Sequence, residues 1–148
     1  MAAARDFSIT VERSGAVLAT RARLADGHWS RFKGLLGRKG LEPGEGLILR
    51  PCWSVHMFFM RFPLDVIFID KEQRVVKAVP NLGVWRMSAA RGAADAIEIA
   101  AGTLERCPLS PGDRLVIAPV EALASEAPAS GCPAGVGPAR RAWRRRKD

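Results

Sequence analysis

Hydrophobic and polar residues alternate along much of the N-terminal part of the chain, and this period of two is typical of half-buried β-strands. Phe7, Ile9 and Val11 alternate with polar neighbours, so residues 7–11 are expected to form a strand with one face toward a core. Ser14-Gly15 then predicts a turn, after which residues 16–22 return as the hairpin partner.

A helical spacing of apolar residues occurs over residues 28–36. Asp26 stands where an N-cap residue is expected, and Gly37 and Gly40 follow the last apolar position. This segment therefore predicts one short helix, which is followed by a loop over residues 42–46 and a strand that begins at Leu47.

The most apolar part of the chain is residues 53–70, where two segments predict strands with apolar residues on both faces. These segments are residues 53–60 and 64–69, and we expect them to pair as a hairpin about residues 61–63. Residues 74–79, 96–100 and 114–118 predict further strands, residues 81–93 an irregular loop, and residues 103–107 at most one helical turn. The predicted fold is mainly β, a small single-domain β barrel or sandwich of about seven short strands with one or two short helices.

The domain is expected to cover residues 6–119, and residues 120–148 predict a disordered tail because they are rich in Ala, Gly and Pro. The chain has 148 residues and a net charge of +8, to which the tail contributes a dense basic cluster at its end. No apolar run is long enough to span a membrane and no secretory signal is recognised, so a cytoplasmic location is expected.

His56 and Asp65 are the polar residues of most interest, because both stand within the apolar segment 53–70. A buried carboxylate must find a partner or take up a proton. In the predicted hairpin Asp65 would lie near His56 or Phe58, and a His56–Asp65 hydrogen bond would satisfy both groups. One interpretation is a small polar site; the other is a structural role, in which Asp65 accepts backbone N–H groups from a loop.

Other chemistry is less well supported by the residue spacing. Cys52 and His56 are four residues apart on a predicted strand, about 13 Å, which is too far for one metal ion, so no metal is expected. Ser54 and His56 are about 7 Å apart on one strand face, too far for proton transfer. Glu98 could form a carboxylate pair with Asp65, but strict alternation favours an outward-facing Glu98 on a half-exposed strand. No cofactor is expected.

The tail is a candidate for contact with a nucleic acid or an anionic surface, because clustered arginines with one tryptophan can act through charge and stacking. A solubilising tail without a partner is the alternative. The residues concerned are Arg140, Arg141, Trp143, Arg144, Arg145 and Arg146.

The motif SVHMFFMRFPLDVIFID, together with KGLL, IEIAAGT and PGD, resembles the bacterial and archaeal family known as domain of unknown function 192, or uncharacterised protein family 0127. The resemblance covers roughly residues 8–118 and implies a small, mainly β single domain without an established reaction. It implies a polar signature at Ser54, His56, Asp65, Glu98 and Asp113, with glycines at turns or close-packed positions at Gly34, Gly46, Gly102 and Gly112.

The leading functional hypothesis is a non-catalytic binding or accessory module for a small molecule or a protein. The alternatives are a hydrolase-like enzyme that uses His56 as base with Asp65 as its orienting partner, and nucleic-acid or anionic-surface association through the tail. The candidate ligand-binding residues are Trp53, Ser54, His56, Phe58, Asp65 and Glu98, of which His56 and Asp65 are also the catalytic candidates.

Overall fold

The computed structural model describes residues 5–25, 38–58 and 60–123. The helix predicted over residues 28–36 and residues 124–148 of the predicted tail lie outside this part of the chain, whereas residues 120–123 of that tail form a 3-10 turn. Nine strands, one short helix and a final 3-10 turn are present in the described residues: β1 (Asp6–Val11), β2 (Val17–Ala25), β3 (Glu45–Leu49), β4 (Ser54–His56), β5 (Leu64–Ile69), β6 (Val75–Leu82), β7 (Met87–Ala89), β8 (Asp95–Ala100), α2 (Thr103–Arg106), β9 (Leu115–Pro119) and η1 (Val120–Leu123).

Seven of these strands form one sheet in the order β6-β5-β8-β3-β2-β1-β9, and β4 pairs with β7 in a separate two-stranded sheet. All neighbours are antiparallel except β2 and β3, which run parallel. The two edge strands meet only at their starts, where Arg74 and Arg114 form an isolated bridge and backbone hydrogen bonds join residues 73–75 to residues 112–115. No strand ladder continues from there, so the sheet does not close into a barrel. The prediction of a mainly β domain is confirmed.

Two hydrophobic clusters lie on opposite faces of the large sheet, because neighbouring residues of each central strand point to opposite sides. One cluster contains Ile67 and Ile97 and is covered on its outer side by α2, which contributes Leu104. The other contains Val66 and Phe68 and includes residues of β4 and its flanks. Strands β5 and β8 are buried along their whole length because both of their faces are covered.

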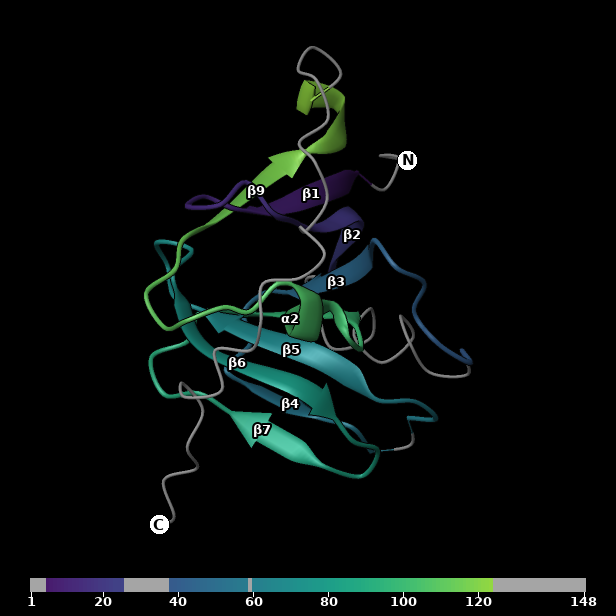
Figure 1. Ribbon diagram of the computed structural model, residues 1–148. Coiled ribbons are helices and arrows are strands. Elements are labelled where there is room, and N and C mark those ends of the chain that lie inside the picture. The colour runs from purple at the N-terminus through teal and green to yellow at the C-terminus, as the bar shows by residue number, and fades with distance from the viewer. Residues whose placement is uncertain (1–4, 26–37, 59, 124–148) are drawn as a thin grey trace.

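The predicted hairpin between residues 53–60 and 64–69 is wrong. The first segment is a strand only over β4, and β4 pairs with β7, which lies inside the region predicted to be an irregular loop. Strand β5 pairs instead with β6 and β8. In Figure 1 the β4–β7 sheet lies at one end of the molecule and β1 and β9 lie at the other.

Candidate functional site

Asp65 is fully buried on the side of the large sheet that faces α2. Its Oδ1 accepts the backbone N–H of Asn81 at 2.7 Å, and its Oδ2 accepts the backbone N–H of Leu104 at 2.7 Å. The carboxylate thereby holds the end of β6 and the start of α2 against β5. The sequence allowed either a polar site or a structural role for Asp65, and this geometry is the structural role, in which the carboxylate accepts backbone N–H groups.

His56 does not meet Asp65. His56 is exposed on β4, and β4 covers the opposite face of the large sheet through Val55. Strand β5 therefore separates the imidazole from the carboxylate, and no hydrogen bond joins them in the described structure. The predicted proximity depended on the hairpin that does not form, so the base–orienter pair of the enzyme hypothesis is absent.

Glu98 is buried, which corrects the expectation that it faces outward. It lies on β8 between Leu47 of β3 and Val66 of β5, on the face opposite to that of Asp65, so the two carboxyl groups do not converge. No hydrogen bond or ion pair of its side chain occurs among the described residues. Burial alone raises the pKa of Glu98 from 4.5 to about 7. Alternation failed as a guide because both faces of β8 are covered.

Three aromatic rings are in consecutive contact at one end of the β4–β7 sheet. The ring centroids of His56 and Phe58 are 5.0 Å apart in a stacked arrangement, and those of Phe58 and Trp85 are 6.0 Å apart in a tilted one. Met87 stands opposite His56 on β7. Trp53 is exposed at the other end of the same small sheet, beside Ala90. We call these exposed side chains at the two ends of the β4–β7 sheet the aromatic face; Trp53, Trp85 and Met87 are each 60% or more exposed.

The backbone of Trp85 has a positive φ of 61°, which is uncommon for a bulky residue. The Trp85 N–H donates to the carbonyl oxygen of Met57 at 2.9 Å, and the Met57 N–H donates to the carbonyl oxygen of Arg86 at 2.7 Å. Met57 itself is buried. These bonds connect the loop before β7 to the end of β4 and hold Trp85 in an unfavourable backbone conformation. Such strained residues are frequent at functional sites.

An open pocket of about 420 Å³ lies at the other end of the β4–β7 sheet. It is lined by Trp53 and by residues that follow β7, including Arg91 and Gly92. The Trp53 carbonyl oxygen accepts the Ala90 N–H at 2.9 Å, which joins the two segments there.

Charge is distributed unevenly around the aromatic face. Residues 51–64 and 76–94, which contain β4 and β7, hold no Asp or Glu. Arg61, Arg86 and Arg91 are exposed, and their side chains make no ion pair within the described residues. Of the nine other described arginines, five are paired with a carboxylate: Arg13, Arg21, Arg23, Arg38 and Arg50.

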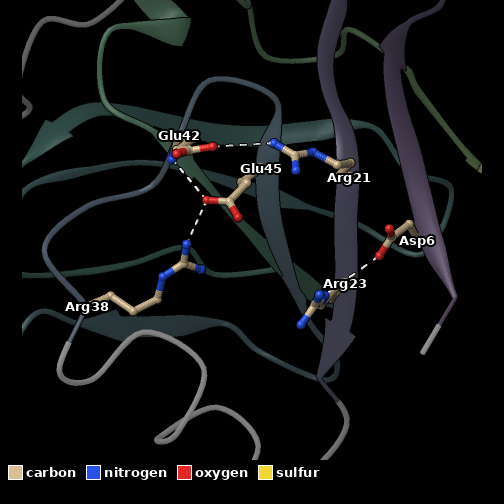
Figure 2. Close-up of polar contacts among 6 residues, drawn as sticks. All are labelled: Asp6, Arg21, Arg23, Arg38, Glu42 and Glu45. Carbon is tan, nitrogen blue, oxygen red and sulfur yellow. Dashed lines mark hydrogen bonds and ion pairs between the residues drawn. The ribbon is translucent and has the colours of Figure 1, made fainter. Parts of the chain in front are cut away.

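A second pocket, of about 340 Å³, lies beside β2 and β3 and is lined by arginines that have partners. Figure 2 shows Arg38 directed toward Glu45 at 2.8 Å, and Arg21 toward Glu42 at 3.7 Å. Glu45 also accepts the backbone N–H of Glu42, and this hydrogen bond is the main cause that lowers its pKa. These contacts fasten the loop before β3, so the cluster has a structural role.

Metal binding has no support in the part of the chain that is described, which contains no group of three or more His, Cys, Asp or Glu side chains able to hold an ion. Cys52 is buried, and its thiol donates to the carbonyl oxygen of Ser54 at 3.0 Å rather than pointing to His56. Asp113, the remaining residue of the polar signature, accepts the Ser110 N–H at 2.8 Å in the turn before β9. Within the described residues no helix is long and apolar enough to cross a membrane.

Fold and site together define a small, mainly β domain with one exposed aromatic, basic face. The chain belongs to the family described as Uncharacterized ACR, the domain of unknown function 192, whose model matches residues 9–117. A "UPF0127 protein" of Thermococcus sibiricus is 32% identical over 124 residues, which cover 74% of this chain and 80% of the relative. A second one, from Thermococcus kodakarensis, is 31% identical over 115 residues, or 74% of this chain and 73% of the relative.

Two solved structures are also similar. One, from Sinorhizobium meliloti and described as a proposed transcription regulator, has a TM-score of 0.66 and 26% identity, and the match covers 78% of this chain and 94% of that one. The other is a protein of unknown function from Novosphingobium aromaticivorans, with a TM-score of 0.63, 28% identity, and coverage of 75% and 83%.

The sequence predicted Trp53, His56 and Phe58 as candidates but not Trp85 and Met87. These two were missed because residues 81–93 were predicted to form an irregular loop. A signal was present in the sequence: residues 81–93, although predicted as a loop, contain Val84, Trp85 and Met87 and no acidic residue.

Proposed function

We propose that the domain is a non-catalytic binding module and that its ligand lies on the aromatic face. One observation carries the proposal: the rings of His56, Phe58 and Trp85 are in contact with one another and open to solvent. Contiguous exposed apolar surface is uncommon on monomeric proteins and typically marks an interaction site.

Charge indicates the chemistry of the ligand. The segments that form the aromatic face lack acidic residues. Exposed arginines accompany it: Arg91 lines the pocket beside Trp53, Arg86 stands between Trp85 and Met87, and Arg61 follows β4 along the chain. An anionic ligand with flat rings would stack on the aromatic side chains and have its charge neutralised by these arginines. Binding is favoured over catalysis because no carboxylate among the described residues orients the imidazole of His56, as Asp65 would have to do in the proposed base–orienter pair.

Adenosine monophosphate is a suitable probe, because it combines one ring system with one phosphate. In the full-length protein with 13C-labelled methionine methyl groups, we expect the Met87 signal to shift on titration and the signal of the buried Met57 to stay unchanged. The Trp85→Ala variant should bind more weakly. Adenosine and inorganic phosphate, titrated separately, test the ring and the charge. Met87 signals that do not move with the nucleotide, or that move equally in the variant, would contradict the proposal.

A further inference from the structure

The aromatic face has two separate contact regions, one at each end of the β4–β7 sheet. Trp53 and Arg91 line the pocket at one end, and the ring contacts of His56, Phe58 and Trp85 lie at the other. Trp53 and His56 are three positions apart along an extended chain, a distance of about 10 Å. One nucleobase cannot stack at both ends, so a ligand that uses the whole face must carry more than one ring.

Unpaired positive charge accompanies both ends. Arg91 lines the pocket beside Trp53, and Arg86 follows Trp85 directly. Neither guanidinium has a carboxylate partner among the described residues, in contrast to the five paired arginines elsewhere. A ligand that matches this arrangement repeats a flat ring and a negative charge along a flexible chain.

We infer that the aromatic face binds single-stranded nucleic acid, with bases stacked on Trp53 and on the Phe58–Trp85 pair and phosphates beside Arg86 and Arg91. The inference rests on the proposed function and names the ligand class of that site. Aromatic side chains with nearby arginines are the common means of holding single strands without sequence preference. A duplex fits poorly because its bases are already stacked on one another.

The main test is fluorescence anisotropy with the full-length protein and a labelled oligothymidylate long enough to span both ends. Trp85→Ala and Trp53→Ala should each weaken binding about 5- to 150-fold, the range typical of one lost base stack. Val116→Ala is the matched control, because Val116 is 42% exposed on β9, at the end of the molecule away from β7, and should leave binding unchanged. Circular dichroism checks that each variant is folded.

The arginines are tested through the salt dependence of the same titration. Arg91→Gln or Arg86→Gln should reduce the slope of log Kd against log salt by about 0.7, the value for one phosphate contact on a single strand. Arg114→Gln, at an exposed position just before β9, is the control. A full-length variant with serine at Arg140, Arg141, Arg144, Arg145 and Arg146 separates any contribution of the tail. Binding that vanishes in this variant and is untouched by Trp53→Ala and Trp85→Ala would overturn the inference.

The remaining arms distinguish failure of the inference from failure of the proposed function. If adenosine monophosphate shifts Met87 but the oligonucleotide binds no more tightly than the mononucleotide, the polymer inference is wrong and the binding module stands. Equal affinity for a duplex of the same length also overturns the inference. Binding to phosphatidylglycerol vesicles that requires Trp85, without oligonucleotide binding, would assign the face to a membrane surface instead.

Discussion

Replacing Glu98 by Gln removes the charge of a buried carboxyl group and keeps the size of the side chain. Glu98 lies between Leu47 and Val66 in the middle of the large sheet. On the same face Arg23 of β2 stands beside Leu47 and is paired with Asp6, and Glu45 of β3, two residues before Leu47, is paired with Arg38. No charged partner in the described part of the chain offsets the cost of burial, and burial raises the pKa of Glu98 from 4.5 to about 7.

The pKa difference determines the size and the sign of the effect on stability. Between pH 4.5 and about 7 the unfolded chain has lost the Glu98 proton while the folded chain retains it. Unfolding then releases a proton, so the free energy of unfolding falls as pH rises through this interval and stays low above it. At about 1.4 kcal/mol for each pH unit, the wild-type protein loses about 3 kcal/mol of stability through this group.

Urea denaturation of the wild type and of Glu98→Gln, from below pH 4.5 to above pH 7, measures this loss. The variant lacks the titration, so its stability relative to the wild type should rise with pH and end about 3 kcal/mol higher than at the acidic limit. All other groups titrate in both proteins and cancel in the difference. Glu72→Gln, at an exposed position in the turn after β5, is the control and should show no such rise.

A stability difference between wild type and Glu98→Gln that stays constant across this pH range would refute the reasoning. A difference that grows toward acidic pH would refute it as well, because it would mean that the folded protein stabilises the ionised form of Glu98.

Two further predictions concern the scaffold. Asp65→Ala leaves the buried N–H of Leu104 and the partly buried N–H of Asn81 without an acceptor. It should lower the free energy of unfolding by about 1–3 kcal/mol for the buried N–H and by less for the other. Asp65→Asn, which keeps one acceptor oxygen, should cost less, and urea denaturation ranks the two. Gly46→Ala should cost about 1–3 kcal/mol, because an added Cβ would lie 3.3 Å from both the Glu98 carbonyl oxygen and the Ile99 side chain. Gly40→Ala, where nothing lies within 4 Å, is its control in thermal denaturation, and equal effects of the two substitutions would contradict the packing argument.

Local patterns in the sequence were sufficient for much of the fold. Residues 7–11, 64–69 and 96–100 were predicted as strands from short-range alternation or continuous apolar runs, and β1, β5 and β8 occupy these positions. Such signals depend only on neighbouring residues. Strand pairing is different, because β4 pairs with β7 across about thirty residues and neither three-residue strand is long enough to show a period.

The same distinction explains the outcome for the candidate site. The alternation around β4 predicted that Ser54 and His56 share one strand face, and Val55 between them is buried in the cluster under the β4–β7 sheet. Asp65 and Glu98 were harder to place because burial of both faces of β5 and β8 removes the polar side that alternation normally reveals.

The two sides of the β4–β7 sheet have separate roles, and this separation supports the choice of variants that test ligand binding. Val55, Met57 and Ala90 pack inward against the large sheet, and their burial holds the small sheet in place. His56 and Met87 point outward and contribute little to that packing, because both are exposed. Removing an outward ring should therefore change binding and leave stability nearly unchanged, whereas Met57→Ala should lower stability and binding together. An exposed ring whose loss destabilised the fold as much as the loss of Met57 would be a structural element, not a contact for a ligand.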